Sequence, residues 1–575
     1  MKKLLAYLRP YQKECVISPL FKMLEAIFDL LVPLVVKQII DVGIANADKP
    51  YIVGMCAILV GFAVIGLTCS VIAQYYAARA AVGFSSEVRR DLFAHIQKLS
   101  YAETDRVGTA TLITRMTADI NQLQSGVNMT LRLFLRSPVI VFGAMIMAFT
   151  VNPKSALVFV LIIPLLSVVV FTIMLKSVPL FKKVQQNLDL VTARTRENLT
   201  GVRVIRAFRK EDAEIESFHA ANEEHNRMQN FVGKISALMN PITLVLVNLG
   251  LILLLWSGAE LTFAGEMTQG DVLAMTNYMA QILVELVKFA NTIILVNKAL
   301  ACGNRVQAVL ETPAGMEILE KADKAQSQDA VTFCKVGLTY RGHAAPSLSD
   351  IALSVPRGAT VGIIGSTGSG KSSVVNLIPR FYDATEGAVL VNGRDVRTYQ
   401  TEELRNRIAI VPQKAVLFRG TVRSNLLWGN KHATDEELWA ALEAAQAKEF
   451  IEQKEGGLDA EVTQGGKNFS GGQRQRLTIA RALVRKAEIL ILDDSSSALD
   501  YATDAALRQA IMALPENPTT FIISQRTSSI QHADMILVLE DGHPAGLGTH
   551  EELLKTSEVY REIYESQFRK GGETA

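Results

Sequence analysis

Four long stretches of this 575-residue chain contain no Asp, Glu, Lys or Arg, and they constrain its fold more than any other feature. They cover residues 50–78, 137–153, 155–175 and 235–259. A helix needs about 20 mostly apolar residues to cross the hydrocarbon core of a bilayer, and about 17 are enough at the short end of the range. Charged residues make up 20% of the chain, below the roughly 25% of an ordinary soluble domain. We therefore predict that all four stretches span a membrane.

Two further apolar stretches, 16–40 and 271–297, contain a few charges each. These charges are Lys22, Glu25, Asp29 and Lys37 in the first stretch and Asp271, Glu285 and Lys288 in the second. Buried amphipathic helices of a soluble domain would show the same pattern. Charges inside a bilayer need a partner or water, so helices whose polar faces line a cavity would show it too. Because six spans give a consistent topology, we predict that both stretches cross the membrane.

Six spans place the connecting loops alternately on the two sides of the membrane. The loops near 45–51, 150–154 and 260–270 then share one side, and their only cations are Lys49 and Lys154. The opposite side receives many Lys and Arg residues, which makes it cytoplasmic by the positive-inside rule. Those cations follow membrane-proximal loops and have no aromatic residues between them, so we predict no nucleic acid partner. The expected location is the inner (cytoplasmic) membrane.

The two predicted cytoplasmic loops, about 80–128 and 178–234, are long and helical in pattern. Each contains a short segment suited to docking on another domain, 108–119 in the first loop and 201–211 in the second. A solvated amphipathic turn is the alternative for each segment.

The composition changes after residue 310. Residues 311–329 are polar and are typical of a linker. From residue 330 onward, short apolar runs of β type alternate with helical patterns, which indicates an α/β domain. The sequence therefore predicts a membrane domain over 1–310 and an α/β domain over 330–575.

A phosphate-binding motif follows the apolar run 360–364 and precedes a helical pattern. It reads Gly365-Ser366-Thr367-Gly368-Ser369-Gly370-Lys371-Ser372. This is GxxxxGK[ST] in its strand–loop–helix context, where glycines let backbone N–H groups turn toward phosphate oxygens. We expect Lys371 to reach the β- and γ-phosphates and the Ser372 hydroxyl to bind Mg²⁺. A second apolar run, 489–492, ends in Asp493, which we expect to complete the Mg²⁺ site of an ATPase.

Between these motifs lies Phe469-Ser470-Gly471-Gly472-Gln473. Here the chain resembles the ATP-binding-cassette (ABC) family, whose signature is LSGGQ, and the six preceding spans resemble its exporter type. The resemblance covers nearly the whole chain. It implies a six-span α-helical membrane domain followed by an α/β P-loop ATPase cassette, and it identifies 108–119 and 201–211 as coupling helices.

The resemblance also assigns roles to single residues. It implies that Tyr340 stacks on adenine, that Gln413 senses Mg²⁺ as part of the metal site, and that Asp500 lies in a loop at the dimer seam. In this family each ATP is enclosed between the phosphate loop of one cassette and the signature of another. Glycines, a serine hydroxyl and a helix N-terminus make the signature a second phosphate cradle. A chain with one cassette and six spans is expected to pair with itself or with a relative.

Two positions depart from the family pattern. The family normally has Glu as base for the attacking water where this chain has Asp494, and His where it has Gln525. One methylene fewer withdraws the carboxylate by roughly 1.5 Å, and a general base must lie within hydrogen-bond reach of its proton. We therefore expect slow hydrolysis at this site. The combination resembles one subunit of the heterodimeric bacterial multidrug exporters, whose partner is expected to carry the Glu and the His.

The cargo is the least constrained property. The charges of the first and sixth spans are consistent with a cavity for cationic or amphipathic compounds, but interhelical ion pairs without substrate contact are the favoured interpretation. Asp41 is a candidate for an extracellular gate or for a helix cap. The sequence favours ATP-driven export of small amphipathic compounds. Lipid export, peptide export and a nucleotide-gated sensor without transport are the alternatives.

Overall fold

The computed structural model describes residues 3–319, 328–341, 344–495 and 497–568. The chain forms two compact units. The membrane unit comprises Met1–Gln97 and Thr109–Pro313, and the cassette unit comprises Lys98–Gly108 and Ala314–Ala575. Within the predicted linker, 311–329, residues 320–327 lie outside the described residues.

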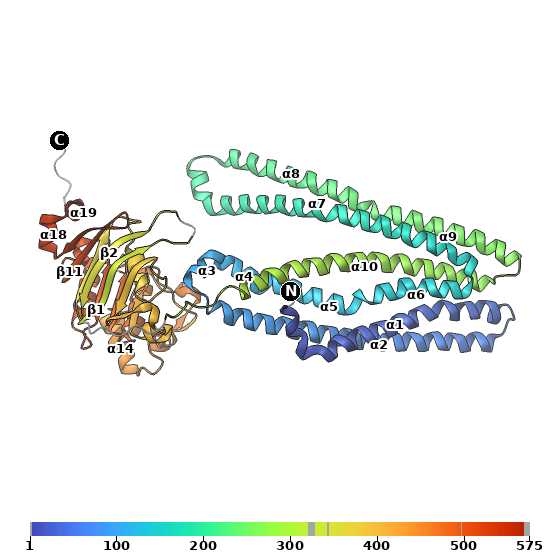
Figure 1. Ribbon diagram of the computed structural model, residues 1–575, viewed down its shortest axis with the longest axis horizontal. Coiled ribbons are helices and arrows are strands. Elements are labelled where there is room, and N and C mark those ends of the chain that lie inside the picture. The colour runs from blue at the N-terminus through green and yellow to red at the C-terminus, as the bar shows by residue number, and fades with distance from the viewer. Residues whose placement is uncertain (1–2, 320–327, 342–343, 496, 569–575) are drawn as a thin grey trace. The chain divides into compact units, whose positions relative to one another are not determined.

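The membrane unit is helical throughout (Figure 1). Its α-helices are α1 (Gln12–Gln38), α2 (Lys49–Ile96), α4 (Thr109–Thr114), α5 (Ile120–Met129), α6 (Arg136–Val151), α7 (Pro153–Ala207), α8 (Glu211–Ala237), α9 (Met239–Phe263) and α10 (Gln269–Leu310). A 3-10 helix, η1 (Leu4–Tyr11), precedes α1, and π-helical turns η2 (Ile39–Ile44), η3 (Arg115–Asp119) and η4 (Thr130–Phe134) join some of the others. Figure 1 shows α1 beside α2 and α7 beside α8, and both pairs are packed together.

Five helical stretches within the described residues are long and apolar enough to cross a membrane. They are Lys49–Ile96, Thr109–Val151, Pro153–Ala207, Glu211–Phe263 and Gln269–Leu310. The last of these contains the charged stretch 271–297, and α1 contains most of the other charged stretch, 16–40. Because α1 is not among the five, the six-span count stays a prediction.

The α10 helix begins at a set of side chains that satisfy its first backbone N–H groups. Thr268 and Asp271 form a capping box. Asp41, at the end of the predicted first span, accepts hydrogen bonds from Thr268 Oγ1 (2.5 Å) and from the N–H of Gly270 (2.8 Å). Lys37 pairs with Asp271 at 2.6 Å. Asp41 therefore helps to cap α10, whereas the predicted cap was for the first span.

The cassette unit is α/β. Its strands are β1 (Asp329–Leu338), β2 (Leu348–Pro356), β3 (Thr360–Gly365), β4 (Glu386–Val391), β5 (Arg394–Asp395), β6 (Ile408–Val411), β7 (Gly420–Thr421), β8 (Glu461–Val462), β9 (Ile489–Asp493), β10 (Thr519–Ile523), β11 (Met535–Glu540) and β12 (His543–Gly548). Its α-helices are α3 (Tyr101–Val107), α11 (Lys371–Leu377), α12 (Thr401–Asn406), α13 (Val422–Leu426), α14 (Asp435–Ala444), α15 (Lys448–Glu452), α16 (Gly471–Leu483), α17 (Tyr501–Met512), α18 (His550–Thr556) and α19 (Glu558–Phe568).

The main sheet has the order β12-β11-β3-β10-β9-β6. Its strands are parallel except for β12, which runs antiparallel to β11. All five residues of β9 are buried, as expected for a central parallel strand covered on both faces. A smaller antiparallel sheet has the order β2-β1-β4-β5, and β7 pairs with β8. In a parallel sheet, ligands bind outside the carboxyl ends of the strands, so this edge positions the site.

The predicted docking segment 108–119 is wrong in position, because the cassette unit includes Lys98–Gly108 instead. Ser100 caps α3 by accepting from the N–H of Glu103, and Gly108 ends the helix with φ of 81°. Residues 109–119 belong to the membrane unit, where Asp119 pairs with Arg305 at 2.5 Å. The serine and glycine that bound α3 are a sequence signal that places the helix one segment earlier.

The second predicted docking segment, 201–211, is the turn between α7 and α8. It groups with the membrane unit, and the Phe208 side chain is 72% exposed. Its docking on a cassette stays a prediction.

Candidate functional site

Four parallel strands bring the predicted ATP-site residues to one edge of the main sheet. The phosphate loop follows β3, Asp493 ends β9, Gln413 comes two residues after β6, and Gln525 comes two residues after β10. In the register of the sheet, Ile523 of β10 lies between Ile363 of β3 and Asp493 of β9. Segments that are more than 100 residues apart in the sequence therefore meet at the edge where nucleotide ligands bind.

The phosphate loop has a backbone that its glycines make possible. Gly368 and Gly370 have φ of 90° and 91°, a conformation that L side chains rarely adopt. A Cβ on Gly365 would lie 2.1 Å from the carbonyl oxygen of Leu539, so no larger residue fits there. Ser366 and Thr367 are exposed, whereas Ser369 is buried beneath them. The loop therefore presents an open backbone cradle of the kind that binds phosphate.

Lys371 is held close to this loop through backbone oxygens. Its Nζ donates to the carbonyl oxygens of Gly365 (2.8 Å) and Ser366 (2.6 Å). Burial lowers the pKa of Lys371, and the charges of Asp494 and Asp493 oppose that shift. Within the described residues, no carboxylate forms an ion pair with Lys371 at 4.0 Å or less. Its charge therefore stays available for a phosphate.

The predicted metal ligands Ser372 and Asp493 are in direct contact. The Ser372 hydroxyl donates to Asp493 Oδ1 at 2.9 Å. Burial raises the pKa of Asp493, the hydrogen bond from Ser372 opposes the shift, and the nearby Asp494 adds to it. A hydroxyl and a carboxylate are hard oxygen ligands that suit Mg²⁺, which commonly takes one or two protein oxygens beside substrate phosphates. These two residues therefore fit the ion, and its charge would offset the cost of burying Asp493.

Gln413 contacts the predicted base instead of the metal ligands. Its Nε2 donates to Asp494 Oδ2 at 3.4 Å, a long hydrogen bond. Asp494 has a left-handed backbone with φ of 47°, and its N–H donates to the carbonyl oxygen of Ile523 at 3.1 Å. Gln525 is exposed, and its carbonyl oxygen accepts from Gln567 Nε2 at 2.7 Å. Hydrogen bonds therefore fix the backbone at Asp494 and at Gln525, the two positions that depart from the family pattern.

The predicted base-stacking residue, Tyr340, is half-buried beside the phosphate loop helix. Its hydroxyl donates to Ser373 Oγ at 2.9 Å, so one edge of the ring is tied to α11. Tyr382 lies against Tyr340 with the ring centroids 5.0 Å apart and the planes perpendicular. A tyrosine held on two sides in this way can offer its remaining face to a base.

The signature residues form the beginning of α16. Ser470 Oγ accepts from the N–H of Gln473 (3.2 Å), and Gln473 Oε1 accepts from the N–H of Ser470 (2.9 Å), which is a capping box. No described atom lies within 4 Å of a Cβ placed on Gly471, whereas one on Gly472 would lie 3.1 Å from the carbonyl oxygen of Ala498. This cap was not predicted from the sequence, although Ser-x-x-Gln is its known pattern.

The predicted seam residue Asp500 also caps a helix. Its Oδ1 accepts from the N–H of Thr503 at 2.7 Å, at the start of α17. The side chain is exposed. Both predicted contact loops therefore have a local role that holds them in shape.

Comparison with known proteins places the chain in a family. The family description "ABC transporter transmembrane region" matches residues 15–286, and "ABC transporter" matches residues 348–497. An uncharacterized ABC transporter ATP-binding protein of Mycobacterium tuberculosis (strain CDC 1551 / Oshkosh) is 37% identical over 571 residues, which cover 98% of this chain and 97% of the relative. The chain belongs to the ABC transporter family.

Other similar proteins cover the full length as well. An uncharacterized ABC transporter ATP-binding protein of Bacillus subtilis (strain 168) is 35% identical over 100% of both chains. An ATP-dependent lipid A-core flippase of Vibrio vulnificus (strain CMCP6) is 28% identical and covers 99% of this chain and 98% of its own. The solved structure of a bacterial Atm1-family ABC exporter with ATP bound matches the fold with a TM-score of 0.79 at 24% identity, over 98% of this chain and 99% of that chain.

The predicted family and fold class are therefore confirmed. The protein is an ABC exporter with fused membrane and ATPase domains, and its ATPase activity is coupled to transport. It is a multi-pass membrane protein whose ATPase domain is cytoplasmic.

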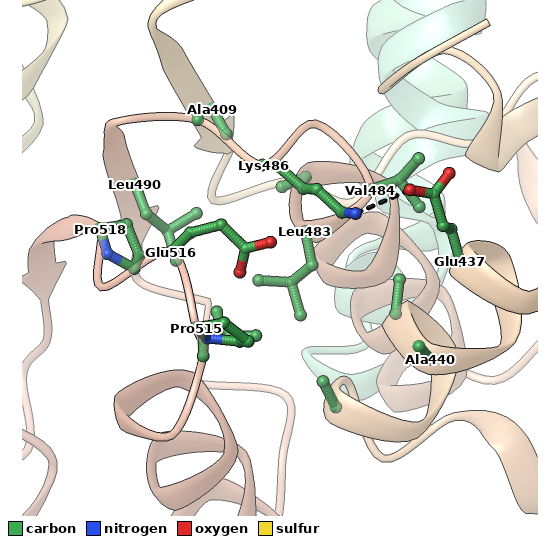
Figure 2. A pocket seen from close by; sticks show the side chains of 15 residues that line it. Ala409, Glu437, Ala440, Leu483, Val484, Lys486, Leu490, Pro515, Glu516 and Pro518 are labelled. Carbon is green, nitrogen blue, oxygen red and sulfur yellow. Dashed lines mark hydrogen bonds and ion pairs between the residues drawn. The ribbon is translucent and has the colours of Figure 1, made fainter. Parts of the chain in front are cut away.

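The ABC cassette also contains a cavity of about 230 Å³ that is separate from this site (Figure 2). Its lining includes Ala409 near the start of β6, Leu490 near the start of β9 and Pro518 just before β10. The cavity therefore lies at the amino ends of these strands, opposite the phosphate loop. Figure 2 shows the ion pair at its rim, where Lys486 and Glu437 are 2.7 Å apart.

The membrane unit of this exporter contains a network of buried charges on α1, α6 and α10. Arg136 pairs with Glu285 at 2.7 Å and with Asp29 at 2.9 Å. Lys22 pairs with Glu25 at 2.6 Å, and Lys288 pairs with Glu285 at 3.0 Å. The interhelical ion pairing that the sequence leaves as an alternative is therefore present.

The sequence analysis missed Arg136, the centre of this network. Its side chain is 12% exposed, and that of Glu285 is 5% exposed. Ser137 adds a hydrogen bond to Glu285 at 2.9 Å. The available signal was the position of Arg136, which directly precedes the uncharged stretch 137–153 and so lies at membrane depth by continuation of α6.

Proposed function

We propose that this chain is one half of an ABC exporter for small amphipathic compounds, and that its own ATP site hydrolyses slowly. Asp494 carries the proposal, because it stands where the attacking water needs a general base. Base catalysis typically contributes a factor of roughly 10²–10⁴. The shorter side chain loses reach, and the hydrogen bond from Gln413 occupies one of its oxygens.

The other site residues have roles that follow from their geometry. The cradle from Gly365 to Ser369 binds the phosphates through backbone N–H groups, Lys371 neutralises their charge, and Tyr340 stacks on the base. Ser372 and Asp493 would hold Mg²⁺, and Gln413, which donates to Asp494, would be a further oxygen ligand for it. When bound, Mg²⁺ neutralises negative charge on the phosphate oxygens. Gln525 donates a hydrogen bond to the γ-phosphate and, unlike His, takes up no proton.

In this proposal, a second half-transporter pairs with this chain to form the complete exporter. The signature of this chain departs from the family pattern only at Phe469 and is supported by its capping box. Ser470, Gly471, Gly472 and Gln473 then face ATP bound by the partner, and Asp500 lies at the seam. A partner with Glu and His at the positions of Asp494 and Gln525 would hydrolyse that ATP efficiently. We therefore propose a non-identical subunit as partner.

Lipid is a second candidate cargo. A relative that aligns over 99% of this chain is named a lipid A-core flippase. Within the membrane unit, each charged group of the network forms an ion pair with another member. This self-pairing favours a cargo recognised largely through apolar contacts, as both amphipathic compounds and lipids are.

Identification of co-purifying proteins by mass spectrometry tests the partner. The tagged chain is purified from its native membrane, and we expect a second half-transporter that carries Glu and His. Recovery of this chain alone would contradict the heterodimer.

An ATPase assay of the purified complex tests the slow site. We expect Asp494→Glu to raise turnover at this site about tenfold or more, since it restores the reach of the base. Asp494→Asn is the matched control and should give no rise. Unchanged turnover in Asp494→Glu would show that the carboxylate position does not limit hydrolysis.

A further inference from the structure

The helix α3 is fastened to the cassette by three side chains. Glu103 pairs with Arg341 at 2.7 Å. The Tyr101 ring packs on Phe381 with centroids 4.4 Å apart. Asp105 Oδ2 accepts a hydrogen bond of 2.6 Å from the hydroxyl of Tyr382. All of these residues belong to the cassette unit, although the chain enters α3 from α2 and leaves it toward α4.

The third contact of α3 leads toward the ATP site through a hydrogen bond and a ring contact. The Tyr382 hydroxyl donates a hydrogen bond to Asp105. The Tyr382 ring contacts the Tyr340 ring, with the centroids 5.0 Å apart and the planes perpendicular. Tyr340 in turn donates to Ser373, which follows the metal ligand Ser372 on α11. A continuous series of contacts therefore runs from α3 through Tyr382 to Tyr340.

Each contact in this series is directional. Burial raises the pKa of Tyr382, and the hydrogen bond to Asp105 acts in the same direction. The phenol therefore stays protonated and donates a hydrogen bond to the carboxylate. Perpendicular aromatic pairs have a preferred geometry, so a rotation of one ring displaces the other. A base stacked on Tyr340 restricts the rotation of that ring and thereby restricts Tyr382. The phosphates, in contrast, are expected to bind at the phosphate loop.

We propose that Tyr382 is a positioning residue that links the base-binding face of Tyr340 to α3, so that α3 responds to the nucleotide base and not to the phosphates alone. This inference rests on the proposed role of Tyr340 as the base-stacking residue. It makes Tyr382 and Asp105 the route by which occupancy by a nucleoside triphosphate reaches a segment that is continuous with two helices of the membrane unit.

Hydrogen–deuterium exchange of the full-length protein in lipid nanodiscs tests the proposal. Exchange in residues 98–108 is compared without nucleotide, with MgATP and with magnesium tripolyphosphate, which has phosphates but no base. In the wild type, MgATP should slow this exchange and tripolyphosphate should not. Tyr382→Phe should reduce the ATP-dependent protection about tenfold, as expected when a hydrogen bond to a charged group is removed. Asp105→Asn should reduce it less, because its amide oxygen still accepts from Tyr382 but carries no charge.

Two control variants separate this role from general support of α3. Arg341→Gln removes the ion pair with Glu103 but leaves the Tyr382–Asp105 hydrogen bond and the Tyr382–Tyr340 ring contact in place, so it should raise exchange equally with and without ATP. Tyr399→Phe is a control elsewhere in the cassette, where it removes the hydrogen bond from the Tyr399 hydroxyl to the carbonyl oxygen of Val391. It should leave the ATP response unchanged. Asp105→Asn keeps both aromatic rings, so it remains informative if Tyr382→Phe folds poorly.

The possible outcomes are distinct. Wild-type ATP-dependent protection in both Tyr382→Phe and Asp105→Asn would overturn the inference, and so would equal protection by tripolyphosphate and ATP in the wild type. The proposed function is tested separately by the affinity of Tyr340→Ala for ATP. If that affinity is unchanged, the base-stacking role of Tyr340 fails, whatever the exchange data show.

Discussion

The buried charges of the membrane unit and those of the ATP site differ in how they are satisfied. In the membrane unit, Arg136 is paired with Glu285 and Asp29. In the cassette, Lys371 is held by two carbonyl oxygens and has no carboxylate in ion-pair contact among the described residues. Asp493 is buried with a single neutral donor, Ser372. The charges of the membrane network pair with one another, whereas the charges of the ATP site stay available to a ligand.

This difference separates scaffold from site. A buried ion costs several kcal/mol unless a partner offsets the loss of water. The membrane network meets that requirement internally and so holds three helices in register. In the cassette, Lys371 and Asp493 lack a partner of opposite charge in direct contact among the described residues. This is typical of positions whose partner is a bound anion or a metal ion.

The largest expected effect comes from breaking the membrane network. Arg136→Met leaves Glu285 buried without its main partner, and removal of one member of a buried pair typically costs about 3–5 kcal/mol. We expect a clear fall in the thermal unfolding temperature in nanodiscs. The double variant Arg136→Met, Glu285→Gln should recover much of the loss, because the two charges that it leaves unpaired, Asp29 and Lys288, are 44% and 47% exposed and can be solvated.

The matched change in the cassette should act differently. Lys371→Met removes a cation that has no carboxylate partner, so we expect the stability to stay within about 0.5 kcal/mol of the wild type. Its ATP affinity should be lost. Equal unfolding temperatures for Arg136→Met and wild type would contradict the distinction between the two regions.

A smaller effect is expected at the signature, where one side chain has both a local and a ligand-facing role. Ser470→Ala removes the cap of α16 and should destabilise the cassette by about 1 kcal/mol. Ser470→Thr keeps a hydroxyl and should retain most of that stability. Thermal unfolding of the two variants measures the cap. If Ser470→Ala unfolds at the wild-type temperature, the capping box does not support α16.

The smallest effect is expected from the titration of Asp493, because the hydrogen bond from Ser372 and the charge of Lys371 offset part of the raised pKa. A carboxyl whose pKa is higher in the folded state than in the unfolded state binds its proton more tightly when folded. Its contribution to stability is therefore present at low pH and is lost as pH rises through the folded pKa. Without Mg²⁺, the wild type should gain stability relative to Asp493→Asn as pH falls.

Mg²⁺-dependent ATP binding should show the opposite trend, because the ligand must be deprotonated. Its loss should begin at a higher pH than the ordinary Asp pKa of about 3.9 suggests. ATP titrations across pH measure this. A stability difference between wild type and Asp493→Asn that does not change with pH would exclude a raised pKa.

Much of the nucleotide site could be predicted because its residues are close in sequence. Eight successive residues form the phosphate loop, and their glycines encode its backbone directly. The membrane-spanning stretches were predictable for a similar reason, since a run without charges needs no knowledge of its neighbours. The cap at Ser470 was encoded equally locally and was overlooked.

Contacts between distant segments were not predictable in this way. Arg136 and Glu285 are 149 residues apart, and Tyr382 and Asp105 are 277 apart. Nothing in the residues around Asp105 indicates a tyrosine partner in the cassette. The docking helix was therefore expected about ten residues too late in the chain.

The sequence by itself determined the class of this protein, namely a membrane-spanning ATPase of the ABC exporter type, because apolar runs and a glycine-rich loop act through local physics. Only the tertiary structure decided which charges satisfy one another and which stay available to a ligand. It also decided that α3 belongs to the cassette. The physical reason is that pairing depends on which side chains the fold brings within a few ångströms, and separation along the chain does not set that distance.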